Sequence, residues 1–275
     1  MFEAASEVNL SKLVIASIDE MATKRTEELG VVGNVHASSI MYCMLRQYYS
    51  MTNTPVTNPN SPAEKYKLHQ GNIAEAALAS LMERDGYKLL SDLETVSYRG
   101  VSCTPDRILV AEIAGVEYPL APVEFKNVDS YSFMKIAMEG LEKANLPYYV
   151  QCLLYAAALG FSGTKFFMAA KSPAAIQTEI GRKLKGLSKK PGIQSIRDKE
   201  ALLKINGWSY EEWIPLNDQN KVLLERVFQR VAVLYNMLKL GTPPPREYTP
   251  GKDWQCDYCP FRIRCEIENG DRKDE

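Results

Sequence analysis

The sequence predicts an α/β fold in which a small mixed sheet is flanked by helices. Three observations indicate this fold. Apolar residues recur at helical spacing near both ends of the chain. Residues 87–128 alternate apolar and polar side chains between turns. A further strand-like run, GTKFFMAAK at residues 163–171, follows a second helical region. The expected order is helix, helix, strands, helix, strand, helix, an order typical of a helix-flanked sheet.

Length and composition place the chain among globular proteins. Its 275 residues are 45% hydrophobic and 24% charged, so a substantial core is expected. No apolar run approaches the ~20 residues of a membrane span, and the first residues lack the basic-then-apolar pattern of a signal peptide. We therefore expect a cytoplasmic protein without membrane contact.

The first third of the chain is expected to be helical. Residues 8–29 carry Leu, Val, Ile and Met at helical spacing. Ser38 or Ser39 is expected to cap a second helix, SIMYCMLRQYYSM, which a polar loop rich in Asn, Thr and Pro follows. An Ala-rich stretch from residue 63 then predicts a long helix that stops at Gly86.

Strands and helices alternate in the remainder. The 87–128 stretch predicts three or four strands in antiparallel hairpins, with residues 112–118 at one hairpin tip. Residues 131–160 predict helix broken near Asn145–Pro147, and 217–241 predict a long amphipathic helix. We expect one domain, 1–275, made of an N-terminal helical part (1–60), a catalytic core (61–180), a basic stretch with the long helix (181–250) and a cysteine-rich tail (251–275).

Charge is distributed unevenly. The net charge is −1, yet residues 182–204 contain eight Lys or Arg and two acids, a local balance of +6 that leaves about −7 for the rest. This basic stretch is either a solvated helix end and loop or a contact for DNA.

An acid and a lysine stand two residues apart in the run PVEFKNVD. Because strand side chains alternate, Glu124 and Lys126 would share one face while Val123 and Phe125 enter a core. A salt bridge is the simplest interpretation. Asp106, at the start of the preceding strand, would bring a second carboxylate to the same strand ends.

Two neighbouring carboxylates repel each other unless a cation lies between them. Hard divalent cations such as Mg²⁺ or Mn²⁺ take oxygen ligands of this kind. A lysine beside them, here Lys126, can stabilise the charge that develops on a phosphate. Asp106, Glu124 and Lys126 thus suit the hydrolysis of a phosphodiester bond, although the spacing alone is also common in surface ion pairs.

Other polar residues could surround this group. Gln151 and Tyr155 are i, i+4 on an otherwise apolar helix, so they share a face that meets either the sheet edge or solvent. Glu75 lies four residues after Gly71 on the Ala-rich helix, where small neighbours permit close packing; alternatively it is a plain exposed glutamate.

Three of the six cysteines lie close together in the tail. Cys256, Cys259 and Cys265 form C-x2-C-x5-C, a spacing that suits zinc or a [4Fe–4S] cluster once a fourth thiolate is added. The candidates for that fourth ligand are the remaining cysteines. Among them, Cys103 and Cys152 fit the role of small buried side chains.

These motifs together resemble the PD-(D/E)xK nuclease superfamily, and more narrowly its RecB-like exonuclease branch. Many RecB-like members have histidine where this chain has Glu75, and related phage-type exonucleases have glutamate there. Cluster-bearing members, among them CRISPR-associated exonucleases, pair three C-terminal cysteines with one N-terminal cysteine that Arg and Tyr often follow. Cys43, Arg46 and Tyr49 fit this pattern, with Met44 where proline is usual, so the resemblance spans about residues 38–266.

The resemblance implies a restriction-endonuclease-like core, a Mg²⁺ or Mn²⁺ site, and a [4Fe–4S] cluster that joins N- and C-terminal helical parts. Asp106, Glu124 and the Phe125 carbonyl would bind the metal, with Glu75 as a further ligand. Lys126 would be the catalytic lysine, and Gln151 and Tyr155 would support the site. The implied cluster ligands are Cys43, Cys256, Cys259 and Cys265, and DNA is expected to contact Arg46, Tyr49, Lys183, Lys185, Lys189 and Lys190.

The predicted function is a metal-dependent DNA exonuclease that acts on single strands or DNA ends. Recombination, repair and CRISPR-type adaptation all suit such an enzyme, with protein partners in a DNA-processing complex. A non-catalytic DNA-binding or adaptor subunit is the alternative, and a zinc-stapled structural protein is a third. An iron–sulfur protein is brown whereas a zinc protein is colourless, so colour distinguishes the zinc-stapled protein from the iron–sulfur exonuclease.

Overall fold

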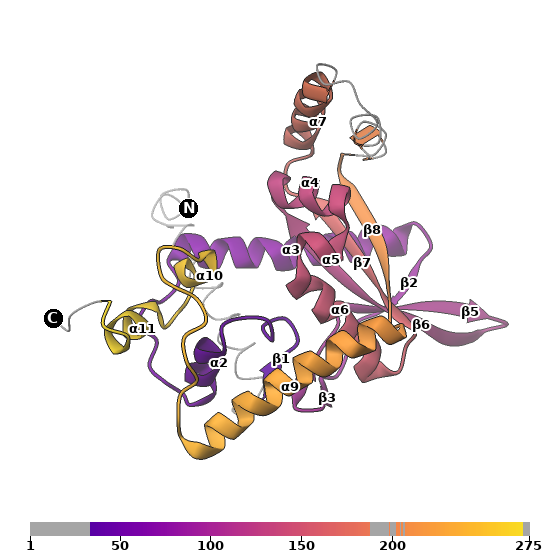
Figure 1. The fold of residues 1–275 in the computed structure, drawn as a ribbon. Coiled ribbons are helices and arrows are strands. Elements are labelled where there is room, and N and C mark those ends of the chain that lie inside the picture. Colours follow the sequence, from indigo (N-terminus) through magenta and orange to yellow (C-terminus); the bar gives the residue numbers. More distant parts are fainter. Residues whose placement is uncertain (1–33, 188–197, 199–201, 204, 206, 272–275) are drawn as a thin grey trace, which may run out of the picture. The chain divides into compact units, whose positions relative to one another are not determined.

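The structure is a computed structural model that describes residues 34–187, 198, 202–203, 205 and 207–271 (Figure 1). The helix expected at residues 8–29 lies outside these ranges. The chain forms two compact units. One, here called the sheet unit, contains Val35–Met41 and Ala74–Ala232; the other, here called the cysteine unit, contains Tyr42–Ile73 and the chain from Val233. Within the described ranges, no helix is both long and apolar enough to cross a membrane.

A mixed sheet forms the centre of the sheet unit. Its described strands follow the order β2-β5-β6-β7-β8, in which β6 and β7 run parallel and the other neighbours run antiparallel. The predicted small mixed sheet is therefore confirmed. The strands are β2 (Lys88–Leu90), β5 (Arg107–Ile113), β6 (Val116–Val128), β7 (Gly163–Ala170) and β8 (Ser209–Pro215).

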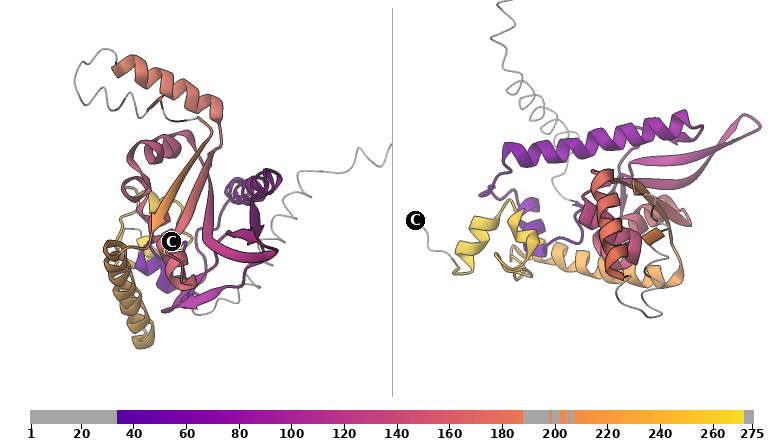
Figure 2. Two further views of the ribbon diagram at one scale, coloured as in Figure 1. Left: turned by 90° about the vertical axis from the view of Figure 1, so that its right-hand side faces the viewer. Right: turned by 90° about the horizontal axis from the view of Figure 1, so that it is seen from above.

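The β5–β6 hairpin projects beyond the helices that cover the sheet (Figures 1 and 2). Its two-residue tip is Ala114–Gly115, and both residues have positive φ, 53° and 77°. Such a tip matches the right-handed twist of the strands that it joins. The hairpin tip predicted within 112–118 is thus confirmed.

A second, smaller sheet was only partly anticipated. Strand β4 (Val101–Cys103) lies between β1 (Val35–His36), which is parallel to it, and β3 (Val96–Tyr98), which is antiparallel. The sequence pattern did not indicate β1 or β8. Strand β1 is two residues long, and β8 contains two adjacent glutamates that blur its alternation.

Helices cover both faces of the larger sheet. On one face, Leu78 and Ala79 of α3 (Pro62–Arg84) pack against Val123 and Phe125 of β6. On the other, α6 (Leu146–Leu159) contacts β6, β7 and β8, and the Thr164 hydroxyl donates to the Cys152 carbonyl at 2.7 Å. In its described part, this unit also contains α4 (Ser130–Glu139), α5 (Leu141–Ala144), α7 (Pro173–Leu187) and the first part of α9 (Asp218–Leu240).

The break expected near Asn145–Pro147 separates α5 from α6. The Asn145 side chain accepts a hydrogen bond from the Tyr148 backbone N–H at 3.2 Å, and Pro147 lies in the first turn of α6, where no backbone donor is needed. This cap fixes where α6 begins, and therefore which of its side chains face β6.

The cysteine unit contains α2 (Met44–Met51), α10 (Trp254–Asp257) and α11 (Arg262–Glu268), along with one end each of α3 and α9. Helix α2 begins at Met44 with Cys43 at its N-cap, so the predicted cap at Ser38 or Ser39 is wrong. The Ser39 N–H and hydroxyl both donate to the His36 carbonyl in a turn that precedes the helix.

Candidate active site

Strand β6 places its acid and its lysine on the face that α6 covers. Val123 and Phe125 point to the α3 face, where they are buried, and Glu124 and Lys126 alternate with them. The Glu124 side chain is completely buried, whereas 21% of the Lys126 side chain is exposed. A glutamate is rarely buried to this degree unless other groups compensate its charge.

Glu124 is compensated on only one of its two oxygens. Its Oε1 accepts hydrogen bonds from the Lys126 ammonium and from Gln151 Nε2, the latter at 2.8 Å. Its Oε2 has no hydrogen-bond partner among the described residues. An unsatisfied buried carboxylate oxygen is costly, so this atom marks the position at which a ligand would gain most.

Helix α6 contributes side chains that hold Glu124 by hydrogen bonds. Gln151 Nε2 also donates to the Tyr155 hydroxyl at 2.7 Å, so one amide group links Tyr155 to Glu124. Both side chains are buried, and burial raises the pKa of the Tyr155 hydroxyl. The shared helix face is therefore confirmed, and it meets the sheet rather than solvent.

Asp106 immediately precedes β5. Because Arg107 pairs with Val123, the register brings Asp106 opposite Glu124 on the adjacent strand. Asp106 Oδ2 accepts a hydrogen bond from the Phe125 backbone N–H at 2.8 Å, which holds the carboxylate against β6. The structure thus brings together Asp106, Glu124 and Lys126, as the sequence predicted.

Glu75 is linked to Asp106 through Arg107. It projects from α3 and pairs with Arg107 Nη1 at 3.2 Å, and the same guanidinium donates to the Asp106 carbonyl. Since Arg107 alternates with Asp106, it faces α3, away from Glu124. The role of Glu75 as a metal ligand remains a prediction. Arg107 is a residue that sequence reasoning missed, although its position beside Asp106 could have signalled it.

The donor set of this site suits a hard divalent cation. Asp106 and Glu124 offer carboxylate oxygens on neighbouring strands, and Glu124 Oε2 is buried without a hydrogen-bond partner among the described residues. Within the described ranges, no three His, Cys, Asp or Glu side chains are arranged to hold a metal ion by themselves. A backbone carbonyl, such as that of Phe125, would have to complete the set.

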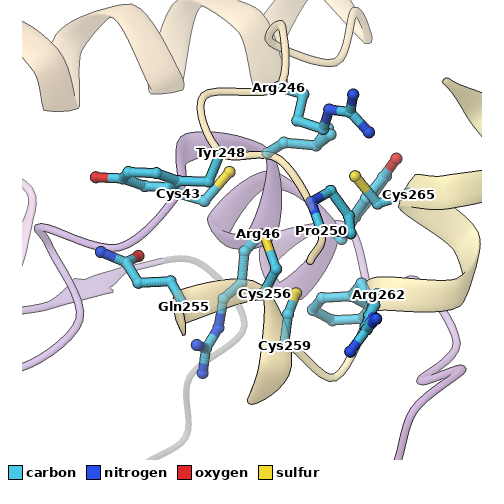
Figure 3. Close-up of a pocket in the computed structure, with 13 residues that line it drawn as sticks. Cys43, Arg46, Arg246, Tyr248, Pro250, Gln255, Cys256, Cys259, Arg262 and Cys265 are labelled. Carbon is cyan, nitrogen blue, oxygen red and sulfur yellow. The ribbon is translucent and has the colours of Figure 1, made fainter. Parts of the chain in front are cut away.

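A second candidate centre lies in the cysteine unit, where four thiols line one pocket (Figure 3). Cys43 precedes α2, Cys256 belongs to α10, Cys265 belongs to α11, and Cys259 lies between these two helices. Figure 3 shows their sulfur atoms turned toward the same space. The pocket spans about 410 Å³, part of it open to solvent, and its lining includes the four cysteines expected as cluster ligands. As they lie among the described residues, these thiols are not arranged to hold a metal ion by themselves, so the four-thiolate site stays a prediction.

Burial and nearby arginines have opposite effects on the pKa values of the cysteines in this pocket. Burial raises the pKa of Cys256 to about 11 and also raises the pKa values of Cys259 and Cys265. The guanidinium groups of Arg46 and Arg246 oppose the shift at Cys259 and Cys265, because a nearby cation favours the thiolate. By contrast, Cys103 and Cys152 are fully buried in the sheet unit, as predicted for small core residues.

The predicted DNA contacts have different outcomes. Tyr49 is not a DNA-facing residue: it is 3% exposed, donates to Glu268 and packs on Phe261 at 5.4 Å between ring centroids. Arg46 lines the cysteine pocket and lies over the Tyr42 ring. Two lysines lie on α7, where Lys183 is near Glu179 and Lys185 is exposed; Lys189 and Lys190 are outside the described residues.

Comparisons with known proteins give remote similarities. No protein-family model matches the chain, and no match was found among curated proteins. Similar solved structures include the alkaline exonuclease LHK-Exo from Laribacter hongkongensis, alone (14% identity, TM-score 0.47, 78% of this chain and 91% of that chain) and in complex with dAMP (15%, 0.45, 76% and 91%). Another is a protein described as SSO0001 (14%, 0.49, 94% and 97%). Similarities this remote assign no activity to this chain.

Proposed function

We propose that this chain is a divalent-metal-dependent DNA exonuclease that hydrolyses phosphodiester bonds in single-stranded DNA or at DNA ends. The supporting observation is Glu124. A fully buried carboxylate holds Lys126 and Gln151 on one oxygen, lies opposite Asp106, and has no hydrogen-bond partner for its other oxygen among the described residues. A structural ion pair has no need of a second carboxylate and an unsatisfied oxygen beside it.

Asp106, Glu124 and the Phe125 carbonyl would hold Mg²⁺ or Mn²⁺, with Glu75 as a further ligand if it leaves Arg107. Such a cation, when bound, would polarise the phosphate and make a water molecule more acidic. Lys126, whose ammonium contacts Glu124, is placed to stabilise negative charge that develops on the phosphate. Gln151 fixes the orientation of the Glu124 carboxylate, and Tyr155 in turn fixes Gln151.

We also propose that Cys43, Cys256, Cys259 and Cys265 hold a [4Fe–4S] cluster. All four line one pocket of the cysteine unit, and together they would join α2 to the C-terminal tail. DNA contacts are proposed for Arg46, Lys183 and Lys185. The resemblance to RecB-like exonucleases supports a place in recombination, repair or CRISPR-type adaptation.

One observation favours a second candidate, a non-catalytic DNA-binding or adaptor subunit. Lys126 pairs with Glu124 and Arg107 pairs with Glu75, so both of these carboxylates have cationic partners within the protein. A subunit that has lost catalysis would keep such pairs for stability alone.

A cleavage assay tests the proposal. Linear single- and double-stranded DNA labelled at either end would be incubated with the full chain and Mg²⁺ or Mn²⁺. We expect Glu124→Gln, which keeps the shape of the side chain and removes its charge, to lower the rate by about a hundredfold or more. The matched control is Glu117→Gln on the same strand, which removes an exposed carboxylate paired with Lys88 and should change the rate less than twofold.

Two outcomes would count against the enzyme. Intact DNA with the unmodified protein, or equal cleavage by Glu124→Gln, would overturn the proposed activity. DNA binding without cleavage that Lys126→Ala leaves unchanged would instead favour the adaptor subunit.

A further inference from the structure

The Lys126 ammonium has a second contact besides Glu124. Its Nζ lies 5.1 Å from the centre of the Tyr148 ring. This distance is within the range in which the electron-rich face of an aromatic ring attracts a cation. The ammonium therefore lies between a carboxylate and a ring, and only 21% of its side chain is exposed.

Tyr148 is itself held in place from two sides. Its backbone N–H donates to the Asn145 cap at 3.2 Å, so the residue lies in the first turn of α6. Its ring lies against Phe166, which is fully buried on β7, with centroids 6.5 Å apart and the planes tilted by 30°. Neither contact involves Lys126, so the ring position does not depend on the lysine.

Helical spacing makes Tyr148 part of the group that already supports Glu124. Gln151 and Tyr155 follow it at i+3 and i+7, so the three side chains form one stripe of α6. Gln151 and Tyr155 orient the Glu124 carboxylate through hydrogen bonds, and Tyr148 contacts the lysine. One helix face thus contacts both charged groups that β6 contributes to the candidate site.

We propose that Tyr148 is a positioning residue for Lys126, an inference that rests on the proposed nuclease function. A divalent cation at Glu124 Oε2 would weaken the attraction between Glu124 and the Lys126 ammonium, because it neutralises the carboxylate and repels the lysine. A lysine displaced from Glu124 could move toward solvent, because its four-carbon chain is flexible. The Tyr148 ring supplies a second attractive contact that keeps the ammonium at the site.

The competing interpretation is that Tyr148 only fills space beside Phe166. Two substitutions separate the interpretations, because Tyr148→Phe keeps the aromatic face and Tyr148→Leu keeps apolar bulk without it. If Tyr148 positions Lys126, the phenylalanine variant should cleave DNA within twofold of the unmodified protein. The leucine variant should lose about tenfold in kcat, with KM for a single-stranded oligonucleotide and the Kd for DNA changed less than twofold.

A double-mutant cycle tests whether the effect passes through the lysine. Tyr148→Leu should have less than a twofold effect on kcat when Lys126 is already alanine, since the contact is then absent. An equal loss in both backgrounds would overturn the proposal. So would equal rates for the leucine and phenylalanine variants, or a loss confined to KM.

A spectroscopic measurement keeps this test independent of the activity. Lysines would be reductively methylated with ¹³C-formaldehyde, and the Lys126 signal would be assigned by its absence in Lys126→Ala. The Tyr148 ring current should move this signal upfield in the unmodified protein and in Tyr148→Phe, and the displacement should vanish in Tyr148→Leu. A signal that is not displaced, or that stays displaced in the leucine variant, would refute the contact. A displaced signal in a protein that cleaves no DNA would refute the proposed function and leave the contact standing.

Discussion

At the scale of single residues, Glu124 determines the energetics of the site. Burial removes the carboxylate from water, and hydrogen bonds from Lys126 and Gln151 compensate only one of its oxygens. The arrangement costs stability that a core residue of the same size would not cost. A buried carboxylate that costs stability is expected where its charge serves a function, so Glu124 is the main support for the proposed function.

Gln151 offers a stability test at this scale. Gln151→Leu removes one amide that serves both Glu124 and Tyr155, and it leaves two buried acceptors without that donor. We expect the free energy of unfolding to fall by about 3 kcal/mol, measured by urea denaturation. Tyr155→Phe keeps the Gln151–Glu124 hydrogen bond and is the matched control, with an expected loss of about 1 kcal/mol. Equal losses in the two variants would contradict this account.

At the scale of elements, the junction between β6 and α4 anchors the strand that carries the site. Asp129 is the N-cap of α4, and its carboxylate accepts hydrogen bonds from the Ser132 backbone N–H and hydroxyl, both at 2.9 Å. Burial acts to raise the pKa of this carboxyl, but the hydrogen bonds outweigh burial and leave the pKa below its ordinary value. The charged form of the Asp129 carboxyl group therefore stabilises α4 more than the neutral form does.

This cap predicts a pH dependence. Because the folded-state pKa of Asp129 is lowered, its contribution is complete above the unfolded value of about 4 and is lost as the pH falls through the folded-state value. Asp129→Asn keeps an oxygen acceptor without the charge, so its stability should decline less steeply in acid than that of the unmodified protein. Asp129→Ala should lose about 1 kcal/mol at pH 7. Urea unfolding at several pH values measures both effects. If the free energy of unfolding falls equally steeply with acid in the asparagine variant and the unmodified protein, the result would argue against the cap.

At the scale of the molecule, the two units contain chemically distinct centres. The sheet unit gathers oxygen donors and a lysine on neighbouring strands, and the cysteine unit gathers sulfur donors from residue 43 and from the tail. The cysteine unit also has contacts that involve no thiol. The backbone N–H groups of Thr57 and Asn58 both donate to the Pro260 carbonyl, and Tyr49 contacts Glu268 and Phe261.

The four-cysteine proposal predicts a visible colour. Purified without oxygen, the protein should be brown and contain iron, and Cys43→Ala and Cys256→Ala should each abolish most of the visible absorbance. Cys103→Ala and Cys152→Ala remove thiols of the sheet unit and should leave the absorbance unchanged. A colourless protein that contains zinc would contradict the iron–sulfur assignment and keep the four-thiolate site. Because contacts such as Tyr49–Glu268 involve no thiol, we expect the colourless variants to lose part rather than all of their stability.

Much of the fold and of the site could be predicted from local pattern. Alternation predicted that Glu124 and Lys126 share a face opposite Phe125, and helical spacing predicted that Gln151 and Tyr155 share another. The pattern also predicted a hairpin tip within residues 112–118, where the structure has Ala114–Gly115. These features depend on periodicity and on short-range geometry. Strand β1 and strand β8 were missed because their sequences are too short or too charged to show a period.

The sequence by itself determined most of the elements and their faces, since periods of two and 3.6 residues are properties of the local backbone. Only the tertiary structure decided which of these faces meet. Tyr49 is buried, and the strand register places Asp106 opposite Glu124. The packing of the elements pairs Glu75 with Arg107 and brings Lys126 to the Tyr148 ring. Such pairings join residues far apart in the chain, and they depend on how whole elements pack together, which no local pattern records.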